Sequence, residues 1–128
     1  MCLGASHFFD AGQAVLRPEA LPVLDAVVSE LKPLQRPIRV EGHTDGSSPV
    51  GTRFRTNWDL SAARAATVVA YVEEAHRVPP ALLAAVGRGA ARPLAPDDSA
   101  EGRELNRRVE LEVELGAGED LPTPAPEP

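Results

Sequence analysis

The residues best suited to bind a ligand lie between positions 38 and 65. Residues 38–41 alternate between apolar and polar side chains, which predicts a short β-strand, and Asp45 lies just past its carboxyl end. A helix is predicted to begin near Asn57, and Arg64 lies two helical turns further along. The amide and the guanidinium therefore share one face of that helix. We expect Asp45, Asn57 and Arg64 to converge on one small pocket.

The flanking sequence predicts the elements that would position this pocket. Apolar residues recur at helical spacing in two segments, residues 18–32 and residues 58–76. Four shorter segments have the character of strands and lie near residues 6–9, 38–42, 84–87 and 107–115. The order β-α-β-α-β-β predicts an α+β fold, a sandwich in which one mixed sheet carries two main helices on one face.

The segment 107–115 gives the clearest strand pattern, because apolar and charged residues alternate strictly along it. Val109 and Leu111 are expected on the core side, almost fully buried. The alternate residues are expected to face water, and these are Arg108, Glu110, Glu112 and Glu114. Arg107 shares the parity of the apolar set, so we expect its side chain on the helix side of the sheet. This strand is predicted to be the longest.

Composition excludes several classes of protein. With 13 basic and 19 acidic residues, the chain has a formal charge of −6, which argues against nucleic acid as a partner. The single cysteine, Cys2, excludes an internal disulfide and a cysteine-rich zinc site, and we expect no cofactor. No apolar run reaches the ~20 residues of a membrane helix, so we expect no membrane contact by this segment.

The two ends of the chain carry separate expectations. Residues 1–4 lack the basic start and the apolar stretch of a signal peptide, so an export signal or anchor is expected upstream or not at all. Residues 117–128 are acidic and rich in proline without periodicity. We expect them to form a disordered tail behind one domain that spans residues 1–116.

Three segments resemble one known family. The sequences are GHTD at 42–45, NWDLSAARA at 57–65 and EGRELNRRVE at 101–110, and residues 8–21, FFDAGQAVLRPEAL, fit the same pattern. In this order they are similar to the OmpA-like C-terminal domain, the peptidoglycan-binding module of outer-membrane protein A, the peptidoglycan-associated lipoprotein and the stator protein MotB. Trp58 directly after Asn57, with a long loop before it, resembles the MotB-like branch most.

The resemblance implies non-covalent binding of the diaminopimelate in the peptidoglycan stem peptide. Asp45 would pair with the ammonium group of diaminopimelate, and Arg64 would pair with the carboxylate on the same carbon. An arginine suits that carboxylate because its planar fork matches the two oxygens, which a lysine cannot do. Asn57 would add hydrogen bonds. The remaining site residues implied by the family are Arg107 as a further lining residue and the turn of Asp10, Ala11 and Gly12 as a wall.

The resemblance also implies a role and a location. The domain would anchor a membrane or envelope protein to the cell wall from the periplasm or cell envelope, as in a MotB-like stator component of the flagellar motor or an outer-membrane protein. Stator relatives dimerise through this domain, so a homodimer is a further expectation. Arg88 departs from the family pattern, because many relatives have an aromatic residue there. Arg53 and Arg55 add cations to the loop before the second helix.

Each residue also has a structural interpretation. Asp45 can cap a turn, Asn57 can be a helix N-cap, and Arg64 can be a solvated surface charge. Arg107 can form an ion pair with Asp10 or Asp45. His43 is expected to be a hydrogen-bonded structural histidine.

Two alternative functions stay open beside wall binding. One is a protein-interaction domain that kept the fold and lost the ligand. The other is a cell-wall hydrolase that uses His43 and Asp45, although no nucleophile in a strained turn accompanies them and Ser61 fits a role at the helix start. Non-enzymatic binding is therefore the primary expectation, with no metal site, because no two histidines have ligand spacing on one element.

Overall fold

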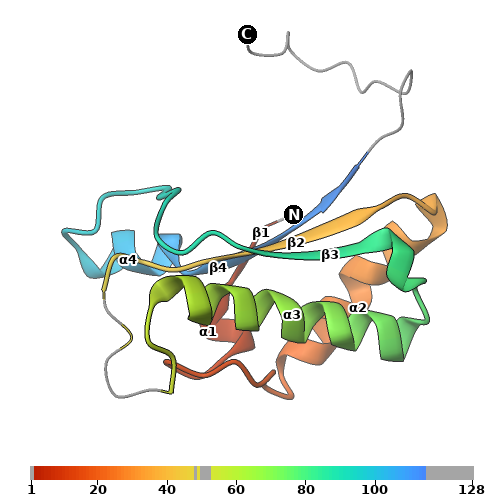
Figure 1. Ribbon diagram of the computed structural model, residues 1–128, viewed down its shortest axis with the longest axis horizontal. Helices are drawn as coiled ribbons and strands as arrows, with labels where there is room; N and C mark the ends of the chain where they lie inside the picture. The colour runs from red at the N-terminus through yellow and green to blue at the C-terminus, as the bar shows by residue number, and fades with distance from the viewer. Residues whose placement is uncertain (1, 48, 50–52, 115–128) are drawn as a thin grey trace, which may run out of the picture.

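The protein, described by a computed structural model over residues 2–47, 49 and 53–114, is built on a mixed four-stranded sheet (Figure 1). The strands follow the spatial order β1 (Cys2–Gly4), β4 (Arg108–Val113), β2 (Ile38–His43) and β3 (Leu83–Gly87). β2 and β3 are parallel, whereas β4 is antiparallel to both β1 and β2. The tail expected at residues 117–128 lies outside the described residues.

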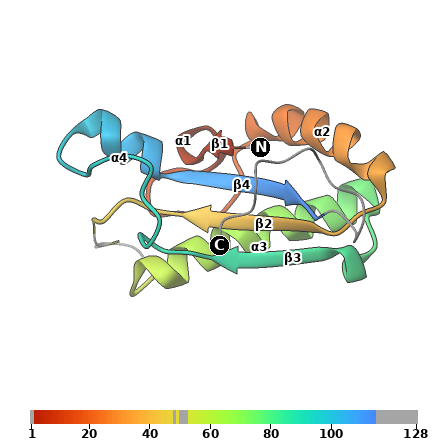
Figure 2. The same ribbon diagram turned by 90° about the horizontal axis from the view of Figure 1, so that it is seen from above.

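The two main helices cover one face of the sheet, as predicted. Helix α2 (Ala20–Leu31) and helix α3 (Asn57–His76) both lie below the strands in Figure 1, and α3 runs along β2 and β3 in Figure 2. Two short 3-10 helices, η1 (Lys32–Leu34) and η2 (Pro80–Leu82), lead into β2 and β3. The fold is therefore α+β. Among the described residues, no helix combines the length and apolar character needed to cross a membrane.

The core lies between this helical layer and the sheet. Most of its fully buried side chains come from α2, α3, β2 and β4, and they include Leu24, Val28, Val40, Val68, Val72, Val109 and Leu111. Gly42 lets α3 approach β2 closely, because a Cβ at this position would lie 2.3 Å from the carbonyl oxygen of Ser61. This close packing fixes the first turns of α3 against the carboxyl end of β2.

The predicted burial of Val109 and Leu111 is confirmed, with 0% and 2% of each residue exposed. Replacing Leu111 with Ala should lower the free energy of unfolding by about 2–4 kcal/mol, because a buried leucine leaves a cavity that the sheet cannot close. Urea denaturation measures this value. The exposed Leu105 provides the control, since Leu105→Ala should change the stability by less than about 0.5 kcal/mol. Equal effects of the two changes would contradict this core.

The strand predicted at residues 6–9 is wrong. Residues Ala5–Phe8 form a short helix, α1, and the edge strand β1 precedes it. Ala5 and Phe8 are both buried, and their spacing of one helical turn places both on the same side. Phe8 and Phe9 are both buried as well, which an alternating strand would not allow. Phe9 forms only an isolated bridge with Leu16.

The last strand also departs from the prediction. β4 has six residues, the same length as β2, so within the described part of the chain it is not the longest strand. Arg108 is buried rather than facing water, because its guanidinium donates to the carbonyl of Arg92 at 3.0 Å and to Glu110 at 2.5 Å. A fourth helix, α4 (Ala100–Asn106), was not predicted. Its N-cap is Ser99, whose hydroxyl accepts from the N–H of Gly102.

Candidate functional site

A cleft of about 660 Å³ lies where α1, α3, α4 and the carboxyl end of β2 meet. Six of the seven site residues predicted from the sequence line it, and the seventh, Asp10, contacts the lining residue Arg64. Its lining consists of Ala5, Ser6, Phe9, Ala11, Gly12, Thr44, Asp45, Ser47, Pro49, Asn57, Leu60, Arg64, Glu104 and Arg107. The predicted convergence of Asp45, Asn57 and Arg64 on one pocket is thus observed.

Asp45 is held rigidly at the end of β2 and is 6% exposed. One carboxylate oxygen, Oδ1, accepts the N–H of Ser47 at 2.8 Å, which is the turn-capping role considered for it, and the other, Oδ2, contacts Arg107 Nη1. Burial acts to raise the pKa of Asp45, but the hydrogen bonds from Ser47 and Arg107 outweigh it and the pKa is lowered. The carboxylate is therefore ionised at neutral pH.

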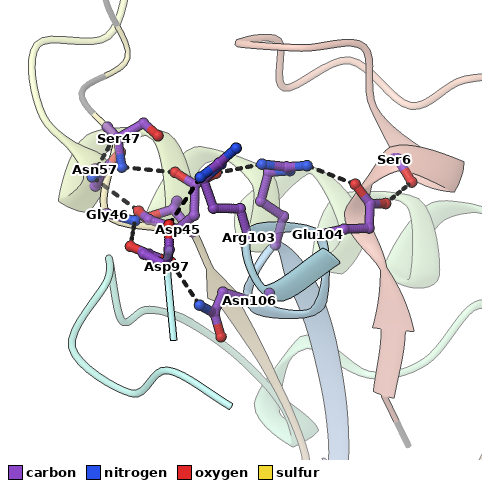
Figure 3. Close-up of polar contacts among 12 residues, drawn as sticks. Ser6, Asp45, Gly46, Ser47, Asn57, Asp97, Arg103, Glu104 and Asn106 are labelled. Atoms are coloured by element: carbon purple, nitrogen blue, oxygen red, sulfur yellow. Dashed lines mark hydrogen bonds and ion pairs between the residues drawn. The ribbon is translucent and has the colours of Figure 1, made fainter. Parts of the chain in front are cut away.

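The loop after Asp45 is tied to the end of α4 by Asp97. The N–H of Gly46 donates to Asp97 Oδ2 at 2.6 Å, and Nδ2 of Asn106 donates to Oδ1 of the same carboxylate at 2.8 Å. Figure 3 shows Asp97 between Gly46 and Asn106. Because Arg107 follows Asn106 directly, this link fixes the two sides of the cleft relative to each other.

Asn57 is not the N-cap of α3. That position belongs to Thr56, which forms a capping box with Asp59: the Thr56 hydroxyl accepts the N–H of Asp59, and the Asp59 carboxylate accepts the N–H of Thr56. Asn57 begins the helix, and its Nδ2 donates to the carbonyls of Ser47 at 2.9 Å and Asp45 at 3.3 Å. Its amide thus supports the loop that carries Asp45.

Arg64 is a buried cation rather than a solvated surface charge, with 5% of the residue exposed. Nε donates to the carbonyl of Gln13 at 2.7 Å, Nη2 donates to the carbonyl of Asp10 at 3.1 Å, and the guanidinium lies 5.0 Å from the centre of the Phe9 ring. Burial, with the charge of Arg107, lowers the pKa of Arg64 to about 10 against the opposing effect of Asp45. Arg64 therefore stays charged at neutral pH. The third nitrogen of its guanidinium, Nη1, takes no part in the two hydrogen bonds to these carbonyls.

Arg107 joins two carboxylates across the cleft. Nη1 contacts Asp45, which is one of the two ion pairs considered from the sequence, and Nη2 lies 2.6 Å from Glu104 Oε1. The second oxygen of Glu104 accepts the hydroxyl of Ser6 at 2.5 Å. Figure 3 shows this row of contacts from Asp45 to Glu104 and Ser6. Burial acts to lower the pKa of Arg107, but the two carboxylates outweigh it and the pKa is raised.

The predicted wall is formed by Ala11 and Gly12, whereas the side chain of Asp10 lies elsewhere. Gly12 adopts a φ of 70°, in the left-handed region that glycine tolerates without strain, and this turns the chain back toward Arg64. Asp10 is not among the described residues that line the cleft. Its carboxylate is 75% exposed and lies 3.8 Å from Arg17 Nη1, so only its carbonyl serves the site, through Arg64.

The lining residues that were not predicted as site residues include Ser6 and Glu104, which form the row of contacts with Arg107. Glu104 precedes Arg107 by three residues, a spacing that brings side chains together on a helix. That signal required α4 to be predicted first. The charged residues that line the cleft are two cations and two carboxylates: Arg64, Arg107, Asp45 and Glu104. The cleft therefore suits an oriented ligand group that carries both an ammonium and a carboxylate.

A second polar cluster occupies the sheet face away from the helices. Nε2 of the buried His43 lies 3.4 Å from Glu41 Oε1 and 3.9 Å from Glu110 Oε2, and these groups lie close enough together to hold a metal ion. Both carboxylates already form ion pairs with arginines. Glu41 lies 2.8 Å from Arg39 and 2.9 Å from Arg88, and Glu110 lies 2.5 Å from Arg108. These cations oppose binding of a divalent ion, and we assign the cluster a structural role. Arg88, the departure from the family pattern, thus serves the sheet and not the cleft.

His43 is buried as expected but is not hydrogen-bonded as expected. Among the described residues, neither ring nitrogen has a hydrogen-bond partner. Burial and the neighbouring charge of Arg108 lower the pKa of His43, and the carboxylates of Glu110 and Glu41 oppose this only in part. The folded protein therefore takes up this proton less readily than the unfolded chain.

The free energy of unfolding should fall as the pH is lowered from 7.5 to 5.5. The stabilisation from a neutral His43 is complete above 6.5, the pKa of the histidine in the unfolded chain, and it is lost as the pH falls toward the lower pKa of the folded protein. For one proton, the free energy of unfolding changes by no more than ~1.4 kcal/mol per pH unit. Asp45 and Glu41 titrate below this window, because the pKa of each is lowered from ordinary values of 3.8 and 4.5. In urea denaturation, His43→Gln should show a flatter pH dependence of the free energy of unfolding than the wild-type protein. His7→Gln, at an exposed site, is the control and should keep the wild-type pH dependence. Equal slopes for all three proteins would contradict this.

Comparison with known proteins gives a consistent result. A model of the OmpA family matches residues 8–107 of the chain. Motility protein B of Bacillus subtilis is 38% identical over 108 residues, which are 83% of this chain and 41% of that protein. The peptidoglycan-associated lipoprotein of Pseudomonas aeruginosa is 36% identical over 106 residues, 83% of this chain and 60% of that protein. The chain thus spans about half the length of these relatives.

Solved structures agree with this similarity. The cell wall anchor of the T6SS from Pseudomonas aeruginosa superimposes with a TM-score of 0.81 at 33% sequence identity. The alignment covers 88% of this chain and 78% of that structure.

Proposed function

Since the chain belongs to the OmpA family, we propose that it binds peptidoglycan non-covalently through the cleft around Asp45 and Arg64, and so anchors a larger envelope protein to the cell wall. Its relatives include a peptidoglycan-associated lipoprotein, and its structural neighbours include a cell wall anchor. The observation that carries the proposal is the convergence of a buried carboxylate and a buried guanidinium on one open cleft.

The proposed ligand group is the side-chain end of diaminopimelate, in which one carbon carries an ammonium and a carboxylate. Asp45 is ionised and faces the cleft, so it suits the ammonium. Arg64 is charged and held by two carbonyls through Nε and Nη2, so Nη1 would donate to the carboxylate. The ligand carboxylate would give the buried Arg64 guanidinium, whose hydrogen bonds go to two neutral carbonyls, a partner of opposite charge.

The domain acts as a binding module, not as an enzyme. A hydrolase that uses His43 and Asp45 would need both side chains at one substrate. His43 is 2% exposed, belongs to the cluster with Glu41 and Glu110, and is not among the described residues that line the cleft. The similarity to Motility protein B supports a role as the wall-binding part of a stator-like protein in the periplasm, with a homodimer as the proposed assembly.

Calorimetric titration with a stem tripeptide tests the proposal. L-Ala-D-γ-Glu-meso-diaminopimelate should bind, and the matching tripeptide with L-Lys as its third residue should bind at least about tenfold more weakly, because it lacks the carboxylate that Arg64 holds. Affinity of a single domain for the soluble peptide should be modest, and many copies on one polymer would give tight retention. A folded domain that binds neither the tripeptide nor insoluble peptidoglycan would instead support a protein-interaction domain.

A further inference from the structure

The guanidinium of Arg107 contacts two carboxylates that differ in their exposure to solvent. Nη1 contacts Asp45, whose side chain is 8% exposed, and Nη2 lies 2.6 Å from Glu104, whose side chain is 46% exposed. Glu104 is itself held in place, because Oε2 accepts the Ser6 hydroxyl at 2.5 Å. These contacts come from three elements, so the position of Arg107 depends on α1 and α4 as well as on the end of β2.

The contact between Arg107 and Asp45 has a consequence for any ligand ammonium. Both oxygens of Asp45 already accept protein donors, Oδ1 from Ser47 and Oδ2 from Arg107. An ammonium that binds Asp45 therefore shares the carboxylate with the guanidinium of Arg107, and the two like charges oppose each other. The affinity for the ammonium then depends on how tightly Arg107 is held at Asp45.

Glu104 controls that contact. With Glu104 present, one arm of the guanidinium is bound away from Asp45. Without it, Arg107 can turn both terminal nitrogens toward the two oxygens of Asp45, and a bidentate pair of this kind is stronger than a single contact. We infer that Glu104 is a positioning residue that draws Arg107 away from Asp45 and thereby sets the affinity of the cleft for a ligand ammonium. This inference rests on the proposed function, and it goes beyond it by assigning a role to Glu104, for which the resemblance implied none.

Glu104→Gln provides the test, because it keeps the size of the side chain and its hydrogen bond to Ser6 while removing the charge. Calorimetric titration with the diaminopimelate tripeptide and with its L-Lys analogue should show about threefold to fivefold weaker binding of both, the size expected for a partly exposed ion pair. Both peptides bring an ammonium to Asp45, so both should respond. The matched control is Glu101→Gln, an exposed acid on the same helix that does not line the cleft.

A double-mutant cycle with Arg107→Gln separates positioning from a structural effect. If Glu104 acts through Arg107, adding Glu104→Gln to the Arg107→Gln protein should change the affinity for the tripeptide by less than about twofold. Wild-type affinity in Glu104→Gln, or an equal loss in both backgrounds, would overturn the inference while leaving the proposed function intact. Failure of the wild-type protein and of Glu101→Gln to bind either peptide would remove the proposed function, and the inference with it.

Discussion

Replacing Asp45 with Asn is expected to release the domain from insoluble peptidoglycan. The substitution removes the charge that holds the ligand ammonium and keeps the shape of the side chain. A charge-assisted contact contributes about 1.5–3 kcal/mol, so the affinity for the stem tripeptide should fall roughly tenfold to a hundredfold. Because retention on the wall depends on many weak contacts, a loss of this size at each site should move the protein to the supernatant on centrifugation.

A matched substitution tests whether the effect belongs to the cleft. Asp98 is an exposed acid outside the cleft, so Asp98→Asn makes the same change of net charge and should leave sedimentation unchanged. Circular dichroism spectra should show that both variants are folded. Retention of folded Asp45→Asn on the wall at wild-type strength would exclude Asp45 from the binding site.

The second large effect is expected from Arg64→Lys. A lysine keeps the positive charge, but it cannot donate to the carbonyls of Asp10 and Gln13 and also present a nitrogen to a ligand carboxylate, as the arginine does. Binding of the tripeptide should weaken by about tenfold or more. Thermal unfolding should also show a loss of about 1–3 kcal/mol, because two partly buried hydrogen bonds to carbonyls lose their donor.

The two consequences of Arg64→Lys can be separated. Binding is measured by calorimetry at a temperature where circular dichroism shows that the variant is folded. Arg77→Lys, at the exposed end of the same helix, is the control and should leave both stability and affinity unchanged. The variant with both Asp45→Asn and Arg64→Lys should bind scarcely more weakly than either single variant, because the two residues act on one ligand group. Strictly additive losses would mean that the residues act at separate sites.

The elements that position Asp45 and Arg64 could be predicted because their patterns are local. The alternation of residues 38–41 indicated β2, and the repeat of small and apolar residues along residues 58–76 indicated α3. The spacing of Asn57 and Arg64 then placed both on one side of that helix, and the structure brings both to the cleft. For these residues, periodicity alone was sufficient.

The missing parts depend on short elements and on tertiary contacts. α1 has four residues and α4 has seven, too few for a helical repeat to be distinguished. Because α4 was not predicted, Glu104 could not be placed beside Arg107. The burial of Arg108 depends on the carbonyl of Arg92, a loop residue 16 positions earlier, and no local pattern indicates that contact.

The most direct test of wall binding through this cleft is a nuclear magnetic resonance titration of the labelled domain with the diaminopimelate tripeptide. The largest backbone amide shifts are expected at Gly12, Ser47 and Asn57, which line the cleft from three separate segments. Ala84 and Glu112, at the far end of the sheet, should remain unchanged. Shifts centred on Ala84 and Glu112, with Gly12, Ser47 and Asn57 unaffected, would contradict binding at Asp45 and Arg64.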